Sequence, residues 1–461
     1  MSELFFGNTS ARAQRGGERP RTDGQGGAEK ERLVREEEVA HFRRRMNIRV
    51  KGHAVADPME TFSDMPFAGN VQDGGQTRRV LLENIELSKW KEPTPVQMQA
   101  LPVLVEGRDL LATAPTGSGK TAAFVLPVLL RLGIQEKIAE ERGVRAVLLA
   151  PTRELAAQIH RDVVRLSRGR KLRACLLTKA TASKAASDSK AALAGCDIVV
   201  STPMRLVGLL REAAVSLPRV SIVVLDEADK LFDTGHSGDG DKAFVAQVDE
   251  VLAACSNSGV QRAMFSATMG YQVRELAQSI LRNPVFLSVG TVNAGASTIE
   301  QRLVYVGREE GKLLAMRQLV QEGLHPPVLV FLQSKDRAKE LFHELVYDGI
   351  NVDVIHAGRA QEQRDKIIER FRTGDIWVLI CTDLMSRGID FKGVNMVVNY
   401  DFPQSAVTYI HRIGRSGRAG RKGTAVTFFT EADMISLRSI ANVMRLSGCE
   451  VRRCERLEVC K

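Results

Sequence analysis

Residues 114–121 have the types and spacing needed to bind a phosphate group, and they read Ala-Pro-Thr-Gly-Ser-Gly-Lys-Thr after a short apolar run. The glycines let backbone N–H groups turn toward phosphate oxygens at a helix N-terminus, where the helix dipole also favours an anion. Lys120 can reach the β- and γ-phosphates of a nucleotide, and the Thr121 hydroxyl can ligate Mg²⁺. The pattern predicts a P-loop with alanine in the usual first glycine position; a glycine-rich turn without a ligand is the alternative. The residues predicted at the nucleotide are Ala114, Thr116, Gly117, Ser118, Gly119, Lys120 and Thr121.

Three carboxylates follow the apolar run 222–225, namely Asp226, Glu227 and Asp229. An acidic pair at the end of a buried strand costs free energy unless a cation lies nearby. We therefore expect Asp226 to hold Mg²⁺ through water and Glu227 to orient and deprotonate an attacking water. Acidic caps on the next helix are the alternative, but they do not explain why the carboxylates end a strand that should lie beside the P-loop strand.

Short aliphatic runs alternate with longer helical patterns along most of the chain, which predicts βαβ units and parallel sheets. The predicted strands are 109–112, 146–150, 197–200, 222–225 and 263–266, then 328–331, 352–355, 376–380, 396–398 and 425–429. Small residues from Gly290 to Ser297 separate the two series and predict a flexible linker. Right-handed crossovers should place the loops of both lobes along one crevice-facing edge.

The predicted organisation is a charged N-terminal arm at 1–57, a first lobe at 58–290, a linker at 291–298, a second lobe at 299–448 and a tail at 449–461. The arm is rich in Gly and Arg and poor in aliphatic residues up to about residue 27, which predicts disorder there. Residues 29–46 carry mixed charge on good helix formers, so they predict a helix that is either solvated or in contact with a partner.

Composition limits the kinds of binding partner and the cellular compartment that we expect for this chain. The chain of 461 residues has a net charge of +10, which favours a polyanion without distinguishing nucleic acid from an anionic membrane. The seven scattered cysteines form no C-x-x-C pair, which argues for a reducing compartment and against a disulfide framework or a zinc site. The sequence shows neither a membrane-length apolar run nor a signal peptide, so we expect a soluble intracellular protein without a membrane partner.

With these residues in order, the chain resembles the DEAD-box family of RNA helicases over about residues 46–450, with Asp226-Glu227-Ala228-Asp229 as the eponymous motif. The resemblance implies an α/β fold of two tandem RecA-like lobes, each a parallel sheet flanked by helices. It also implies ATP and Mg²⁺ as cofactors, RNA as partner, RNA-stimulated ATP hydrolysis, and local rather than processive unwinding.

The segment 90–97 resembles the family's Q motif, which implies that Trp90 and Gln97 contact adenine. An aromatic face can stack on the base, and the amide can pair with its edge. Lys89 stands where the family has glycine, and Phe62 is the upstream aromatic, set farther away than usual across a Gly-rich insert.

Other matching motifs imply contacts with RNA and a link between the two ligands. The residues implied at RNA are Pro151, Arg153, Thr202, Arg205, Gln361, Arg364 and Thr382. Ser266 and Thr268 match the motif that connects the ATP and RNA sites, and their hydroxyls are expected to bond the carboxylates of Glu227 and Asp229.

The most specific match in the second half is residues 411–418, His-Arg-Ile-Gly-Arg-Ser-Gly-Arg. It implies that Arg415 and Arg418 act as arginine fingers on the γ-phosphate across the cleft, and a basic surface loop is the alternative. A further match implies that Asp390 faces the ATP ribose.

Finer features resemble the nucleolar subfamily that acts in small ribosomal subunit assembly. They are 48–52, Lys179-Ala180 in place of the family's Gly-Gly, 312–317, 338–342, 351–356 and 447–451. The resemblance implies a nuclear, nucleolar monomer acting on pre-ribosomal RNA with ribosome-assembly proteins. Two alternatives remain open: a DNA-directed or DEAH-type motor, disfavoured by Asp229 where that class has His, and an ATP-switched RNA clamp or assembly scaffold whose unwinding is incidental.

Overall fold

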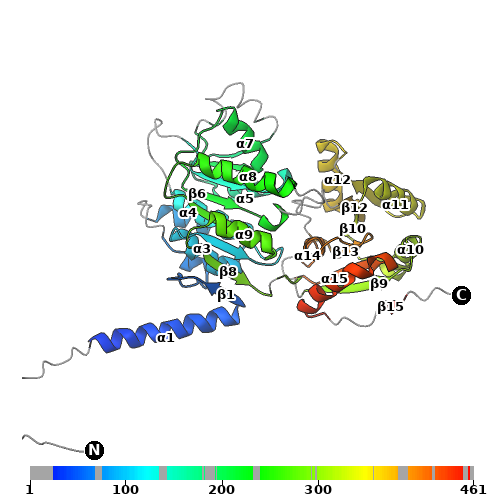
Figure 1. Cartoon of the computed structure of the whole chain (residues 1–461), viewed down its shortest axis with the longest axis horizontal. Coiled ribbons are helices and arrows are strands. Elements are labelled where there is room, and N and C mark those ends of the chain that lie inside the picture. The colour runs from blue at the N-terminus through cyan, green and yellow to red at the C-terminus, as the bar shows by residue number, and fades with distance from the viewer. Residues whose placement is uncertain are drawn as a thin grey trace, which may run out of the picture.

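A computed structural model describes residues 24–67, 75–133, 143–178, 181, 193, 195–231, 239–291, 293–295, 298–356, 358–382, 393–417, 421–449 and 455–456. Two α/β lobes follow one another along the chain, each built around its own sheet (Figure 1). This confirms the predicted fold class. Among the described residues, no helix is both long enough and apolar enough to cross a membrane.

The first lobe has an eight-stranded sheet in the order β1-β8-β2-β7-β6-β3-β5-β4. Its strands are β1 (Ile48–Lys51), β2 (Leu110–Thr113), β3 (Ala146–Leu149), β4 (Ala174–Leu176), β5 (Ile198–Ser201), β6 (Ile222–Leu225), β7 (Gln261–Ser266) and β8 (Val285–Val289). Only β1 runs antiparallel to its neighbour among these strands. The helices are α1 (Gly24–Arg45), α2 (Gln76–Leu87), α3 (Pro95–Val105), α4 (Lys120–Leu132), α5 (Arg153–Leu166), α7 (Pro203–Arg211), α8 (Asp239–Ala254) and α9 (Tyr271–Ile280), with 3₁₀ turns η1 (Phe62–Asp64) and η3 (Ala228–Leu231).

The second lobe has a sheet in the order β11-β12-β10-β13-β14-β9-β15, with parallel pairing throughout the described strands. Its strands are β9 (Ile299–Tyr305), β10 (Val328–Leu332), β11 (Val352–Ile355), β12 (Val378–Thr382), β13 (Met396–Asn399), β14 (Gly423–Phe429) and β15 (Glu455–Arg456). Its helices are α10 (Gly311–Gly323), α11 (Lys335–Tyr347), α12 (Gln361–Thr373), α14 (Ala406–Ile413) and α15 (Met434–Leu446), with the 3₁₀ turn η5 (Glu431–Asp433).

Aliphatic side chains alternate between the two faces of each buried strand. In β2, Leu110 and Ala112 join one apolar cluster, whereas Leu111 joins the cluster on the other face. Strands covered on both sides read as continuous apolar runs, which is why the sequence revealed the central strands so clearly. Their carboxyl ends share one edge of the sheet, and the predicted chemical residues follow directly from that edge.

Three predictions about the architecture need correction. The acidic strand β6 does not lie beside the P-loop strand β2, because β7 lies between them. The first lobe also begins upstream of the expected boundary at 58, because β1 pairs with β8 and its first residue, Ile48, is buried. Charged residues on its exposed side, Arg49 and Lys51, made this edge strand look like part of the arm. Likewise, β15 places two residues of the predicted tail at the edge of the second sheet.

Candidate functional site

A cavity of about 570 Å³ lies where the strand ends of the first lobe face the second lobe, a size suited to a small-molecule ligand. Both lobes contribute to its wall. The lining residues are Trp90, Glu92, Thr94, Gln97, Thr116, Gly117, Gly119, Lys120, Thr121, Ala122, Leu155, Gln158, Asp162, Asp226, Glu227, Gly393, Arg415 and Arg421. Residues predicted from separate motifs at the nucleotide therefore share one cavity.

The P-loop has the predicted strand–loop–helix geometry between β2 and α4. Gly117 and Gly119 have left-handed φ values of 78° and 89°, which favour glycine. A Cβ at 119 would also lie 2.5 Å from Nε2 of Gln97, so the Gln97 amide would have to move. Lys120 Nζ donates to the carbonyls of Ala114 at 2.6 Å and Pro115 at 2.9 Å. The lysine thus lies within the loop at the N-terminus of α4, where an anion is favoured.

Gln97 connects the Q motif to the P-loop through its side-chain amide. Its Oε1 accepts from the backbone N–H of Thr94 at 3.0 Å, closing a capping box at the start of α3. Its Nε2 donates to the carbonyl of Gly119 at 3.0 Å. Because Gln97 is buried, these two bonds hold the loop at a fixed distance from α3.

The two aromatic residues predicted at adenine occupy different positions. Trp90 is half-buried and lines the cavity. Phe62 is only 6% exposed and packs against Trp90, with ring centroids 6.5 Å apart. The guanidinium of Arg165 lies 5.0 Å from the Trp90 centroid. Phe62 is not among the residues that line the cavity, because its ring belongs to the core cluster and packs against Trp90; its predicted contact with adenine stays a prediction.

Asp226 and Glu227 are buried together but differ in electrostatic surroundings. Burial raises the pKa of Asp226 to about 7, with Glu227 adding to the effect and Lys120 opposing it. Burial would raise the pKa of Glu227 as well, but the charges of Lys230 and Arg415 are the main causes that lower it to about 2. Glu227 is therefore anionic at neutral pH, whereas Asp226 is a buried carboxyl whose ionised form needs a cation.

Glu227 also has an unusual backbone and a close partner. Its φ of 50° lies in the left-handed region, a strained position for a residue with a side chain and one that occurs at functional sites. Its Oε2 pairs with Lys230 Nζ at 2.5 Å. The expected bond from a Ser266 or Thr268 hydroxyl to Glu227 is thus replaced by an ammonium from the next turn.

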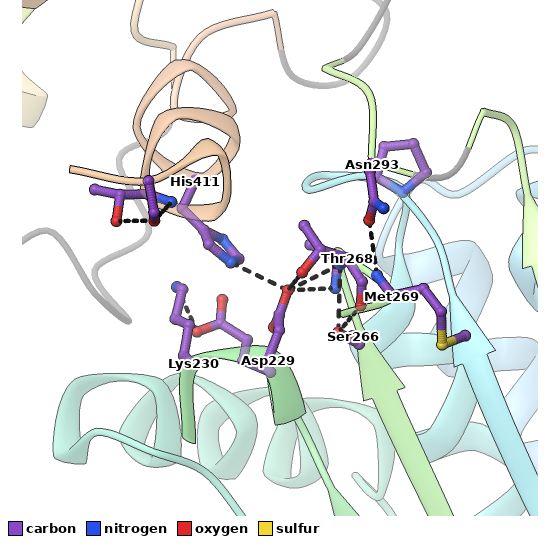
Figure 2. A network of polar contacts seen from close by, with 12 residues as sticks. Asp229, Lys230, Ser266, Thr268, Met269, Asn293 and His411 are labelled. Atoms are coloured by element: carbon purple, nitrogen blue, oxygen red, sulfur yellow. Dashed lines mark hydrogen bonds and ion pairs between the residues drawn. The ribbon is translucent and has the colours of Figure 1, made fainter. Parts of the chain in front are cut away.

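Asp229 joins the two lobes through one carboxylate oxygen (Figure 2). Its Oδ2 accepts from the hydroxyl and backbone N–H of Thr268 at 2.7 and 2.8 Å, and from the N–H of Ala267 at 3.2 Å. His411 Nε2, on α14 of the second lobe, lies 3.2 Å from the same oxygen. The predicted Thr268 contact is present, but the Ser266 hydroxyl donates to the Thr268 carbonyl at 2.6 Å instead of a carboxylate.

The second lobe places Arg415 against the carboxylates of the first. Arg415 is 4% exposed, lines the cavity and contributes to the low pKa of Glu227. A second contact between the lobes joins the Thr116 hydroxyl to the Gly414 carbonyl at 3.4 Å. This is the position across the cleft expected for an arginine finger. The other predicted finger, Arg418, and the predicted ribose contact, Asp390, lie outside the described residues.

In the first lobe, the predicted RNA residues meet at the ends of β3 and β5. Pro151 follows β3, Arg153 begins α5, and Thr202 is the N-cap of α7. Burial and the charge of Arg153 lower the pKa of Arg205, so these two guanidinium groups lie close together. Within the described part of the chain, Arg205 Nε is buried without a hydrogen-bond partner. The arrangement suits an anion placed between the two arginines.

In the second lobe, Gln361 and Arg364 lie in the first turn of α12, and Thr382 ends β12. Arg364 bonds Gln361 and also reaches across the cleft, where its Nη1 lies 3.2 Å from Glu154 Oε1. Glu154 belongs to the same first-lobe motif as Arg153. An ion pair thus connects Arg364, a candidate RNA residue of the second lobe, to the first-lobe helix that begins at Arg153.

Sequence reasoning missed several residues that line the cavity. Leu155, Gln158 and Asp162 are three and four positions apart on α5, a spacing that places them on one helix face. That spacing, together with a P-loop nearby, was the available signal. Gly393 and Arg421 reach the cavity from the second lobe, and nothing local in the sequence marks them.

These features define a nucleotide-binding cleft between two helicase lobes, and comparison with known proteins agrees. Residues 94–276 match the DEAD/DEAH box helicase family, and residues 311–420 match the helicase conserved C-terminal domain. The chain belongs to the DEAD-box family of ATP-dependent RNA helicases.

Particular relatives are similar over most of the chain. It is 49% identical over 420 residues to mouse "Probable ATP-dependent RNA helicase DDX52", covering 91% of this chain and 68% of the relative. It is 50% identical over 414 residues to a Dictyostelium discoideum relative of the same name, covering 90% of this chain but only 59% of that protein. Saccharomyces cerevisiae Dbp5 bound to RNA and ADP BeF3 has a similar fold, with a TM-score of 0.70 and 31% identity over 86% of this chain and 95% of Dbp5.

Replacing Gln97 by Ala should weaken nucleotide binding, because the Gly119 carbonyl and the Thr94 N–H both lose their partner. We expect the KM for ATP to rise about tenfold, since each hydrogen bond contributes about 1 kcal/mol and the loop can partly relax. Steady-state ATPase assays measure this. Gln318→Ala, on the exposed face of α10, is the matched control. An unchanged KM in Gln97→Ala would show that the amide does not position the loop.

Proposed function

We propose that this protein hydrolyses ATP in an RNA-stimulated reaction and uses the cycle to separate short RNA strands locally. One observation carries the proposal. Lys120 and Glu227 from the first lobe and Arg415 from the second line the same cavity, so a phosphate-binding lysine, a buried anionic carboxylate and a guanidinium meet across the cleft.

ATP would bind with its phosphates at the N-terminus of α4 and its base toward Trp90 and Gln97. Lys120 would exchange its bonds with loop carbonyls for phosphate oxygens. Asp226 and Thr121 fit a Mg²⁺ site, because both line the cavity and the buried carboxyl of Asp226 needs a cation. The ion would neutralise charge on the β- and γ-phosphate oxygens.

Glu227 would orient the attacking water and accept its proton, a role that its anionic state at neutral pH permits. Arg415 would stabilise the charge that develops on the γ-phosphate. Because that guanidinium comes from the second lobe, hydrolysis requires the lobes to be together. ATP turnover therefore depends on closure of the two lobes around the cavity.

RNA would bind along the edge formed by Arg153, Arg205 and the first turn of α12. A phosphate at these arginines would offset both the burial and the repulsion from Arg153 that lower the pKa of Arg205. The ion pair of Arg364 with Glu154 would adjust as the backbone enters. Contacts to phosphate and 2′-hydroxyl groups make such binding salt-sensitive and weakly sequence-selective.

ATP and RNA should bind cooperatively, because each contacts groups that come together only when the lobes meet. If the closed lobes accept only a bent single strand, a few base pairs must open on binding. Stacking is worth roughly 1–2 kcal/mol per step in DNA, so short duplexes lie within reach of binding energy. Hydrolysis would then reopen the cleft.

We further propose pre-ribosomal RNA in small-subunit assembly as the substrate, with a nucleolar location, assembly-protein partners and a monomeric state. The subfamily-like segments described above and the similarity to the DDX52 proteins support this proposal. Crosslinking RNA to the protein in cells and sequencing it tests the substrate. Enrichment of unrelated messenger RNA would contradict it.

An ATP-switched RNA clamp is the second candidate, since the same contacts would hold RNA without unwinding it. A short-duplex displacement assay with ATP and with a non-hydrolysable analogue separates the two. Multiple strand-displacement turnovers with ATP support the helicase, whereas stable RNA retention without displacement supports the clamp. ATPase stimulation by RNA but not DNA would exclude the DNA-directed alternative.

Lys120→Ala should abolish ATP turnover, because the phosphates lose their only lysine partner on the P-loop. We expect hydrolysis to fall by about 100-fold or more, measured as phosphate release with saturating RNA. Lys171→Ala, which removes an exposed lysine of the same lobe, is the control. Normal RNA-stimulated turnover in Lys120→Ala would refute the assigned nucleotide site.

Glu227→Gln should separate binding from hydrolysis. The amide can still accept a hydrogen bond from Lys230 but cannot take a proton from water. We expect kcat to fall roughly 100-fold or more, while RNA bound in the presence of ATP is retained and released slowly. Filter binding and single-turnover hydrolysis measure the two effects. Loss of RNA binding in this variant would contradict the proton-acceptor role.

A further inference from the structure

The segment between the lobes is bonded to both of them. At its start, the N–H of Gly290 donates to the carbonyl of Asn47 in the first lobe at 3.0 Å. At its far end, the N–H of Gly295 donates to the Ser447 hydroxyl, after α15 of the second lobe, at 2.8 Å. Between these points, Asn293 Oδ1 accepts from the backbone N–H of Met269 at 2.9 Å. The expectation of a purely flexible linker does not account for these contacts.

The Asn293 bond completes a row of backbone contacts at the segment that follows β7. The N–H groups of Ala267 and Thr268 both point to the Asp229 carboxylate, and the next N–H, that of Met269, points to Asn293 (Figure 2). Three consecutive amides thus have side-chain oxygens as acceptors. One acceptor comes from the acidic motif at the cavity and the other from the linker.

Residue type and backbone conformation both suit asparagine at 293. Its φ of 61° is left-handed, a region that asparagine visits more readily than most residues with a side chain. The side chain then supplies an acceptor that glycine would lack. Substitution by glycine therefore removes the contact without adding backbone strain.

The two anchors are too near in the chain to act independently. Asn293 and Gly295 are two residues apart, so their Cα atoms are separated by roughly 7 Å at most. Gly295 is also closely packed, because a Cβ there would lie 2.8 Å from Cδ1 of Ile413 at the end of α14. Met269 belongs to the first lobe and Ser447 to the second. The bonds Met269–Asn293 and Gly295–Ser447 can therefore exist together only while these parts of the two lobes stay close to each other.

We propose that Asn293 is a positioning residue that holds the linker against the Ser266–Met269 segment and thereby favours the arrangement in which the lobes bind RNA with nucleotide. The proposal rests on the proposed function, since it concerns the closure that nucleotide and RNA share. Asn293 is not among the residues that line the cavity, so it would act through the segment whose other amides bind Asp229.

The test is RNA affinity measured with and without nucleotide on the full chain. Fluorescence anisotropy of a labelled single-stranded ribo-oligonucleotide is followed with ADP, beryllium fluoride and Mg²⁺, and again with no nucleotide. For Asn293→Gly we expect the Kd with nucleotide to rise about two- to tenfold, the range for loss of one neutral hydrogen bond. The Kd without nucleotide should stay unchanged. Asn293→Asp retains the acceptor oxygen and should restore affinity to within about twofold.

Asn283→Gly is the matched control, because Asn283 is another exposed asparagine of the first lobe with a left-handed φ, 43°. It should bind RNA like the unchanged protein under both conditions. Ser447→Ala removes the acceptor at the other end of the linker and should reproduce the nucleotide-dependent loss. If both anchors serve one arrangement, the double variant should lose less than the product of the single losses.

Three results would overturn the role of Asn293. The Kd with nucleotide could be unchanged in Asn293→Gly, or the loss of RNA affinity could be equal with and without nucleotide. The losses of affinity in Asn293→Gly and Ser447→Ala could also multiply fully in the double variant.

Failure of the proposed function would give a different result. If the unchanged protein binds RNA equally with and without nucleotide, the proposed function fails first, and the linker has no closure to favour.

Discussion

Both lobes meet at one buried carboxylate oxygen, Oδ2 of Asp229, and the demands of that oxygen constrain the rest of the cleft. Taking a carboxylate out of water is costly unless donors surround it. Thr268 and Ala267 supply donors from the first lobe, and His411 supplies one from the second. Burial and the charge of Lys230 lower the pKa of His411, so at neutral pH the imidazole is neutral and must carry its hydrogen on Nε2 to donate. The contact between His411 and Asp229 is therefore a hydrogen bond from a neutral imidazole to a carboxylate, rather than an ion pair between the lobes.

Around this contact, opposite charges from distant parts of the chain balance one another. Asp226 and Glu227 introduce negative charge at the end of β6, and Lys120, Lys230 and Arg415 bring positive charge from the P-loop, the next turn and the second lobe. The low pKa of Glu227 depends in part on Arg415, so the state of the carboxylate depends on where the second lobe lies. The position of the second lobe and the pKa of Glu227 are thus coupled by the charge of Arg415.

Much of the site could be predicted because its parts are local. A strand, a glycine turn and a helix N-terminus are encoded within a few residues, so the P-loop and the acidic segment were recognisable, as were the central strands with their unbroken apolar runs. Strands at or near the sheet edges were harder to predict. β1 exposes alternate charged residues, and β9 mixes Glu300 and Arg302 with apolar neighbours, so neither has the pattern of a strand buried on both faces.

The sequence by itself determined that two α/β lobes form, and it predicted many of the residues that line the cavity between them. It could do so because residue type, short spacing and hydrophobic periodicity are properties of neighbouring positions. Only the tertiary structure decided that β7 separates β2 from β6, that Phe62 lies behind Trp90, that Ser266 bonds a carbonyl, and that Asn293 meets Met269. Strand order depends on crossover paths, and side-chain partners depend on close packing between segments far apart in the chain. Local pattern carries no information on either, since many pairings satisfy the same periodicity.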